Sequence, residues 1–259
     1  MSLDNIRVVM ISTSHPGNIG AAARVMKNMG LTRLYLVNPK QFPNYEATAM
    51  ASGADDLLAQ ATVCSSFAEA LTGCHLVLGT TARERKLQHE FIDAREAGVL
   101  SINESAEREV ALVFGRERTG LTNEETGLCH KLINIPTNPD YQSLNVASAV
   151  QIVTYEVMMS LHYLNEESKQ ESSHGDDKAE SIDYASSENM ERFYQHLQET
   201  LVDIDFLRLK QSPQLMPKLR SIYNRVRLKQ EELNILRGIL NKTQQLKNEA
   251  KSSETTDID

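Results

Sequence analysis

The order of apolar segments in the first 165 residues limits the chain to one fold class. Short apolar runs alternate there with segments whose apolar residues recur at helical spacing. We expect strands at residues 6–11, 33–37, 75–80, 110–115 and 132–135. Helices are expected at residues 20–29 and 67–71, followed by a long apolar helix over residues 144–164. Strands that alternate with helices are typical of an α/β domain with a mostly parallel sheet, here residues 1–165.

The composition changes after this first domain. Residues 166–187 are rich in Ser, Asp and Glu, so we expect a flexible acidic linker. Apolar residues then return at helical spacing in two groups, which predicts a small helical domain over residues 188–250. The groups are Met190, Phe193, Leu197 and Leu201, and Leu233, Leu236, Ile239 and Leu240. Residues 251–259 are polar, and a disordered tail is expected.

Composition narrows the function classes. The hydrophobic share of 41% over 259 residues supports a folded core. Asp4 and Arg7 interrupt the first apolar run, and no run reaches membrane-spanning length, so we expect a cytoplasmic protein without a membrane partner. The three cysteines (Cys64, Cys74 and Cys129) are odd in number and lack C-x-x-C spacing. That argues against a disulfide framework and against a metal site.

The distribution of charge is more informative than the total. A net charge of −8 would ordinarily oppose binding to nucleic acid, because phosphates are held by Lys and Arg. Residues 206–229 nevertheless contain seven basic side chains and no acidic one. They are Arg208, Lys210, Lys218, Arg220, Arg225, Arg227 and Lys229. This run predicts an RNA contact, and its alternative interpretation is a solvated helix face.

Three segments of the first domain have compositions that suggest a binding site. Residues 14–24 read SHPGNIGAAAR after the first strand, which places Asn18 and Arg24 near the carboxyl edge where open α/β sheets bind ligands. Residues 112–121 read LVFGRERTGL, a buried strand followed at once by charges. Residues 141–149 read YQSLNVASA at the start of the long helix. Backbone amides at such a helix start suit a polar ligand group.

Each segment also has a purely structural interpretation. The first is compatible with an ordinary strand-turn-helix corner, and the second with a turn closed by an ion pair. In the third, Ser143 could cap the long helix. The chain lacks the G-x-G-x-x-G, G-x-x-x-x-G-K-[ST], H-E-x-x-H and G-x-S-x-G motifs, which argues against dinucleotide enzymes, P-loop proteins, zinc proteases and serine hydrolases.

Taken in order, the segments resemble the SPOUT superfamily, specifically its TrmH-like branch of RNA 2′-O-methyltransferases. The matching patterns are N-x-G-x-x-x-R, F-G-x-E-x-x-G-L, and I-P followed by S-L-N-x-x-x-A. Residues 191–194 (ERFY) and 232–238 (ELNILRG) are similar to the C-terminal extension of bacterial TrmJ-type tRNA methyltransferases. The resemblance therefore covers nearly the whole chain.

The resemblance implies a C-terminal trefoil knot in the first domain, an exception to the rule that connections do not thread loops. It implies a homodimer with the active site at the subunit interface. The cofactor would be S-adenosyl-L-methionine, leaving S-adenosyl-L-homocysteine as product. The residues implied to hold it are Thr80, Thr81, Ala82, Gly115, Ile135, Gln142, Ser143 and Leu144. At Gln142 relatives often have a second Ser, so that contact differs.

The reaction implied by the resemblance is methylation of a ribose 2′-hydroxyl on tRNA, at cytidine or uridine 32 of the anticodon loop. The residues implied to flank the reacting ribose are Arg24, Asn18, Glu117, Ser143 and Asn145. Arginine rarely loses its proton, so Arg24 is expected to bind phosphate or stabilise developing negative charge rather than act as a base. The residues expected to contact RNA are Arg24, Arg116, Lys218, Arg220, Arg225 and Arg227.

Three alternatives remain at this point. The first keeps the chemistry but changes the target to ribosomal RNA. The second is an RNA-binding protein whose methyltransferase fold has lost its activity. The third, a generic dehydrogenase, would require the glycine fingerprint that the chain lacks.

Overall fold

The computed structural model describes residues 3–82, 90–170, 183–208 and 212–256, and it divides into two compact units. The first unit, Met1–Ala179, contains a seven-stranded sheet in the order β3-β2-β1-β6-β4-β7-β5. The strands are β1 Ile6–Ile11, β2 Arg33–Val37, β3 Thr62–Cys64, β4 Cys74–Thr80, β5 Phe91–Ile92, β6 Glu109–Phe114 and β7 Lys131–Ile133. All neighbouring strands pair in parallel. The sequence-based prediction of a mostly parallel α/β domain is confirmed.

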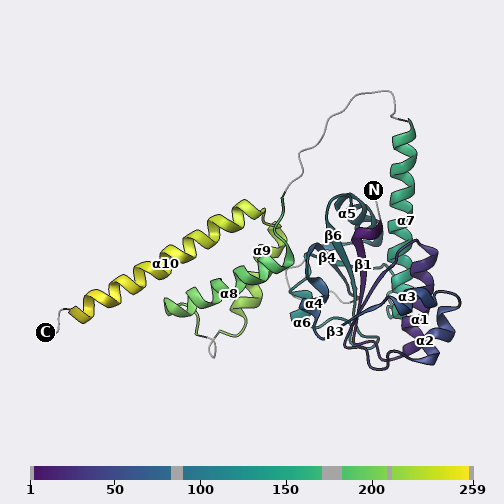
Figure 1. Cartoon of the computed structure of the whole chain (residues 1–259), viewed down its shortest axis with the longest axis horizontal. Helices are drawn as coiled ribbons and strands as arrows, with labels where there is room; N and C mark the ends of the chain where they lie inside the picture. The colour runs from purple at the N-terminus through teal and green to yellow at the C-terminus, as the bar shows by residue number, and fades with distance from the viewer. Residues whose placement is uncertain (1–2, 83–89, 171–182, 209–211, 257–259) are drawn as a thin grey trace. The chain divides into compact units, whose positions relative to one another are not determined.

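Helices cover both faces of this sheet (Figure 1). After the 3₁₀ turn Leu3–Asn5, they are α1 Pro16–Asn28, α2 Tyr45–Ala51, α3 Asp55–Ala59, α4 Phe67–Leu71, α5 Ala94–Ser105, α6 Asn123–Thr126 and α7 Val146–Gln170. Alternate residues of β1 point to opposite faces: Val8 packs with α1, α5 and α7, whereas Val9 packs with α4. This double cover explains why every residue of β1 is buried and why its sequence is apolar except for Arg7.

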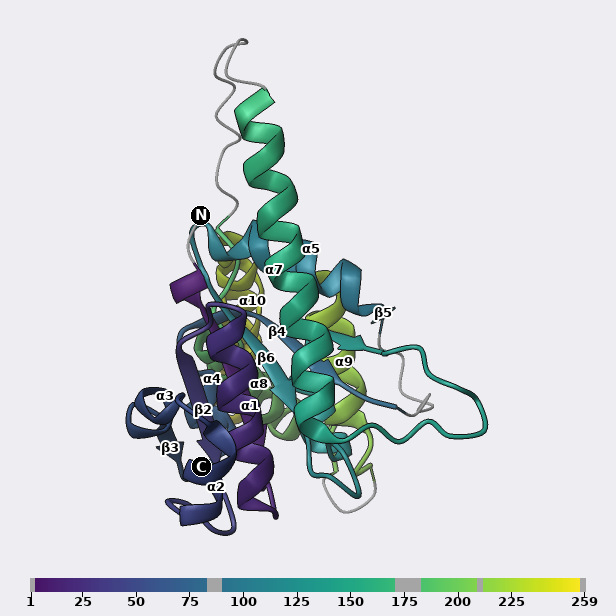
Figure 2. The ribbon, with the colours of Figure 1, turned by 90° about the vertical axis from the view of Figure 1, so that its right-hand side faces the viewer.

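On the first of these faces, α1 and α7 lie side by side (Figure 2). Small residues permit close helix contacts on this side. A side chain at Gly20 would place its Cβ 2.0 Å from the Ala47 carbonyl oxygen of α2, and one at Gly98 of α5 would lie 2.5 Å from the Glu156 carbonyl oxygen of α7. Gly20 therefore lets α1 lie directly against α2.

The start of α7 corrects one prediction. Ser143 was a candidate N-cap, but the helix begins at Val146. Asn145 is the residue that caps it, because its side-chain oxygen accepts a hydrogen bond from the Ala147 backbone N–H at 2.8 Å. The helix also continues through Gln170, into the segment predicted as linker. A polar sequence can extend an existing helix at little cost, because nucleation has already occurred.

The second unit, Glu180–Asp259, is helical as predicted. It contains α8 Ser187–Asp203, α9 Leu215–Val226 and α10 Gln230–Thr256 around a separate core that includes Phe193, Tyr194 and Leu233. The hydroxyl of buried Tyr194 donates to the Asn224 side chain at 2.7 Å. Residues 251–256, predicted as a disordered tail, lie in α10, again as a polar extension of a helix. Residues 171–182 of the predicted linker lie outside the described residues.

Candidate active site

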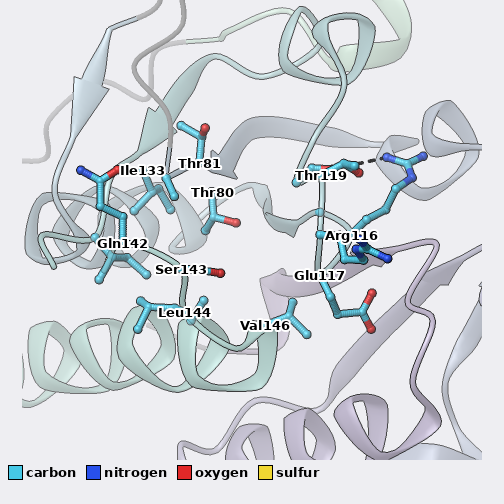
Figure 3. Close-up of a pocket in the computed structure, with 16 residues that line it drawn as sticks. Thr80, Thr81, Arg116, Glu117, Thr119, Ile133, Gln142, Ser143, Leu144 and Val146 are labelled. Carbon is cyan, nitrogen blue, oxygen red and sulfur yellow. Dashed lines mark hydrogen bonds between the residues drawn. The ribbon is translucent and has the colours of Figure 1, made fainter. Parts of the chain in front are cut away.

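A pocket opens at the carboxyl ends of β4, β6 and β7, the sheet edge where parallel α/β proteins bind ligands. All eight residues predicted to hold the cofactor line it: Thr80, Thr81, Ala82, Gly115, Ile135, Gln142, Ser143 and Leu144. The hydroxyl groups of Thr80 and Ser143 point toward the centre of the pocket, and Glu117 lies across from them (Figure 3). Segments far apart in the sequence therefore meet at one edge.

Gly115 allows the loop after β6 to fold back on itself. A Cβ at this position would lie 2.3 Å from the Gly120 carbonyl carbon and 2.4 Å from the Leu121 nitrogen, so only glycine fits. Two backbone hydrogen bonds close the loop, from Arg116 N–H to Gly120 O at 3.2 Å and from Gly120 N–H to Arg116 O at 2.9 Å. The loop is thus held in one shape, and it forms one wall of the pocket.

Arg116 serves this loop through its side chain as well. Its guanidinium forms a bidentate ion pair with Glu125 of α6 at 2.8 and 2.9 Å. It also approaches the Gly120 carbonyl (Figure 3). The hydrogen bond to Glu125 raises the pKa of Arg116. Arg116 was predicted to contact RNA, but its charge is already paired within the protein. The alternative interpretation of residues 112–121, a solvated turn with an Arg/Glu ion pair, therefore holds in part, because the partner of Arg116 is Glu125, outside this segment.

Glu117 joins this loop to the segment after β1. Its carboxylate accepts hydrogen bonds from the Ser14 backbone at 2.9 Å, the His15 backbone at 3.1 Å and the Asn18 side-chain amide at 3.1 Å. Burial alone would raise the pKa of Glu117, but hydrogen bonds from its own backbone, His15, Asn18 and Ser14 bring the pKa below the ordinary 4.5. Glu117 therefore carries a negative charge at neutral pH.

The contact continues to the start of α7. The Asn145 amide donates to the Asn18 side-chain oxygen at 2.9 Å, while the Asn145 oxygen caps α7. We call this row of side chains, Asn145, Asn18 and Glu117, the amide chain. Asn18 and Asn145 do not line the first pocket; they line a second hollow beside it. The amide chain contains three of the five residues predicted to flank the ribose. A fourth, Ser143, lines the first pocket next to it.

Arg24 is the exception among these five residues. It is exposed on α1 and lines neither the first pocket nor the adjacent hollow. The pocket is also lined by six residues that were not predicted from the sequence: Arg118, Thr119, Gly120, Ile133, Val146 and Ala149. The charges that follow β6 drew attention to this loop, but the sequence alone could not tell which of its side chains face the pocket.

The predicted RNA-binding residues of the second unit differ in their surroundings. Lys218 and Arg225 are exposed on α9. Arg220 instead forms a bidentate pair with Glu191 at 2.6 and 2.7 Å and stacks over the Tyr194 ring. Arg227 lies 4.2 Å from the centre of the Tyr184 ring. The basic run therefore supplies structural contacts through Arg220 and Arg227 and leaves Lys218 and Arg225 to solvent.

The chemistry of the first pocket fits a nucleoside-like cofactor. Ile133, Ile135 and Leu144 supply an apolar wall suited to an adenine ring. Thr81 and Ser143, together with the backbone of the 115–120 loop, supply polar groups for the ring edge and the sugar. In the part of the chain that the structure describes there is no cluster of three or more metal-ligating side chains, and no helix is long and apolar enough to cross a bilayer.

Comparison with known proteins identifies the family. Residues 5–155 match the SpoU rRNA Methylase family, and residues 188–254 match the C-terminal domain of the tRNA methyltransferase TrmJ. The chain is 48% identical to a tRNA (cytidine/uridine-2′-O-)-methyltransferase TrmJ from Photorhabdus laumondii, over 92% of this chain and 96% of that protein. It is 48% identical to the TrmJ of Pectobacterium atrosepticum, over 95% of this chain and all of that protein.

Solved structures agree with this. A methylase family protein from Haemophilus influenzae is 40% identical, with a TM-score of 0.61 over 96% of this chain and 100% of that chain. TrmJ from Z. mobilis is 31% identical, with a TM-score of 0.77 over 91% of this chain and 97% of that chain. The chain therefore belongs to the SpoU methylase family and, within it, to the TrmJ-type tRNA methyltransferases.

Proposed function

We propose that this chain transfers a methyl group from S-adenosyl-L-methionine to the ribose 2′-hydroxyl of a cytidine or uridine in tRNA. The target we propose is nucleotide 32 of the anticodon loop. The observation that supports this most directly is the pocket lined by all eight residues selected for the cofactor, with the amide chain beside it. The TrmJ relatives, 48% identical over nearly the whole chain, support the same substrate class.

The cofactor supplies an electrophilic methyl group on a sulfonium centre. The chain's own task is to position the 2′-hydroxyl and to exclude water. The apolar wall would hold the adenine, and the closed 115–120 loop would form one side of the cofactor site. Alignment of two reactants can lower the activation free energy by about 7 to 11 kcal/mol, so a rigid pocket suits this reaction.

Glu117 and its neighbours would orient the ribose. The carboxylate is fixed by three donors and carries charge, and Asn18 is fixed between Glu117 and Asn145. A preorganised polar row of this kind costs little reorganisation when the substrate arrives. Arg24 would bind the adjacent phosphate or stabilise the developing alkoxide, because guanidinium groups keep their proton. We expect Arg24→Ala to abolish turnover while the dissociation constant for the cofactor stays nearly unchanged.

The position of Arg24 supports a homodimer. Arg24 lies on the exposed face of α1 and outside its own pocket, so we propose that it completes the site of a second copy. Subunit exchange tests this. Arg24→Ala and a pocket variant, Gly115→Asp, should each be inactive, and their mixture should regain activity because one site per mixed dimer is intact. A mixture that stays inactive, with mixed dimers confirmed by mass spectrometry, would contradict action between subunits.

The second unit would hold the tRNA body through Lys218 and Arg225. We also propose that the reaction takes place in the cytoplasm.

The proposed reaction can be tested directly. Purified protein should be incubated with unmodified tRNA and methyl-labelled cofactor, followed by nucleoside mapping. We expect 2′-O-methylcytidine or 2′-O-methyluridine at position 32. Methylation of ribosomal RNA alone would favour the first alternative. Absence of product on any RNA together with absence of cofactor binding would favour a non-catalytic RNA-binding protein.

A further inference from the structure

The hollow beside the active site has no role in the function described so far. It lies between α1, α2 and α7, and its lining includes Asn18, Asn145, Glu46, Met50 and Gln151. We propose that this hollow receives the pyrimidine base of the nucleotide that is methylated. The proposal rests on the proposed function, because it assigns a second part of the same substrate to a second part of the same site.

The location of the hollow is the first argument. Asn18 and Asn145 line the hollow, and the amide chain that they form ends at Glu117, which lines the cofactor pocket. A ribose placed at the amide chain therefore has the cofactor pocket on one side and the hollow on the other. The base is attached directly to that ribose, so the hollow is within its reach. Enzymes that act on single-stranded loops commonly receive an unstacked base in such a recess.

The second argument is that the hollow contains polar side chains that are available to bind a ligand. The amides of Asn18 and Asn145 are engaged with each other, with Glu117 and with the helix cap. The side chains of Glu46 and Gln151 are exposed and form no hydrogen bond with any residue that the structure describes. Gly17 keeps room for the Glu46 carboxylate, since a Cβ there would lie 2.8 Å from Glu46 Oε1. Glu46 and Gln151 thus line the recess with open polar ends, next to the exposed side chains of His15 and Ser148, whereas the amides of Asn18 and Asn145 are engaged.

The chemistry of these two groups matches a site that accepts both pyrimidines. Cytosine presents an amino donor at N4 and an acceptor at N3, whereas uracil presents a donor at N3 and an acceptor at O4. A carboxylate such as Glu46 can accept from either donor. The amide of Gln151 can face the exocyclic group at position 4 of either base, because its oxygen can accept from the cytosine amino group and its nitrogen can donate to the uracil O4. Val25 and the flexible Met50 supply an apolar surface for the ring face.

Substitution of Gln151 by Glu tests this assignment. A second carboxylate can still accept from the cytidine amino group, but it repels the uridine O4 and cannot donate to it. We expect Gln151→Glu to lower kcat/KM for a tRNA transcript with uridine at the target about tenfold more than for the transcript with cytidine, the size of one mismatched hydrogen bond. Gln60→Glu is the matched control: it adds the same charge on an exposed residue outside the hollow and should leave the ratio unchanged.

A second measurement uses the unchanged protein. A tRNA transcript with 4-thiouridine at the target nucleotide carries a photoreactive sulfur on the edge that Glu46 and Gln151 would read. Irradiation of its complex with the cofactor product should cross-link peptides that contain Glu46 or Gln151. An unchanged cytidine-to-uridine ratio in active Gln151→Glu, or cross-links confined to other peptides, would overturn the proposal. If the unchanged protein methylates no tRNA, the proposed function itself fails, and this outcome is distinct from either result.

Discussion

Glu117 connects two loops through one carboxylate, and this makes it the most sensitive single residue of the site. Glu117→Gln keeps the size of the side chain but removes the charge and turns one acceptor into a donor facing backbone N–H groups. A fully buried donor left without its acceptor costs about 1 to 3 kcal/mol, and because Glu117 is only half-buried we expect a cost toward the lower end. We expect a lower melting temperature of the first unit and a loss of turnover, measured by calorimetry and methyl transfer. Wild-type stability in this variant would contradict the tethering role.

The same residue predicts a pH dependence. The pKa of Glu117 lies below its ordinary value of 4.5 in the folded chain, so its stabilising effect is fully present above that value. The effect is lost as the pH falls through the lowered pKa and the carboxylate takes up a proton. Unfolding midpoints in denaturant, measured from pH 7 to pH 3, should therefore fall less with acid in Glu117→Gln than in the wild type. Unfolding midpoints that fall equally with acid in both proteins would contradict a stabilising role for the Glu117 charge.

Gly115 gives a second prediction at this scale. In Gly115→Ala the new Cβ would clash with the backbone of Gly120 and Leu121, which would have to move. Overpacking of this kind costs about 1 to 3 kcal/mol and should displace the loop, so we expect weaker cofactor binding by calorimetry. Gly238→Ala is the matched control, because nothing lies within 4 Å of its Cβ position inside α10. It should bind cofactor normally and stabilise its helix by up to about 1 kcal/mol.

At the scale of the element, the start of α7 combines a structural and a functional role. Asn145→Ala should destabilise the helix by about 1 kcal/mol through loss of the cap and should also release Asn18. Asn145→Asp separates the two roles, because a carboxylate can cap the helix but cannot donate to Asn18. We expect thermal stability to be largely restored in Asn145→Asp while methyl transfer stays low. Recovery of both would mean that only capping matters.

The elements also show what a sequence can reveal. Strands β1 and β2 were predicted with correct bounds, since each is apolar apart from a single arginine, Arg7 in β1 and Arg33 in β2. β3 and β5 were missed because they have three and two residues, and Thr62 and Val63 of β3 are exposed. Helix α5 was not predicted, because its buried face consists largely of Ala, Gly and Ser, which give a weak apolar pattern. The polar ends of α7 and α10 were read as unstructured, although helix propagation needs no apolar partner.

The site was predictable only in part, for a related reason. Ordered motifs selected the residues that line the cofactor pocket, since each lies at the end of a strand or the start of a helix. Pairing between distant side chains leaves no local signal. The bond between Arg116 and Glu125, and the bonds that anchor Glu117, therefore appeared only in the fold. The same holds for Arg220, whose basic character suggested RNA while its partner Glu191 lies in another helix.

At the scale of the whole molecule, the two units have separate cores, so RNA binding and catalysis should be separable. Removal of residues 180–259 should leave cofactor binding intact while tRNA binding weakens. The double variant Lys218→Ala/Arg225→Ala should lower the slope of log K against log salt by about 1.4 to 1.8, the effect of two phosphate contacts. Filter binding over a salt series measures this. An unchanged slope would exclude both side chains from the RNA contact.

The amide chain joins residues that are 99 and 127 positions apart in the sequence. Contacts between residues so distant in the sequence form slowly, so we expect the amide chain to form after the sheet has aligned the strand ends. A chain still emerging from the ribosome cannot complete these contacts until α7 has been synthesised. We therefore expect a growing chain to become able to transfer methyl groups only after α7 has been synthesised and has docked.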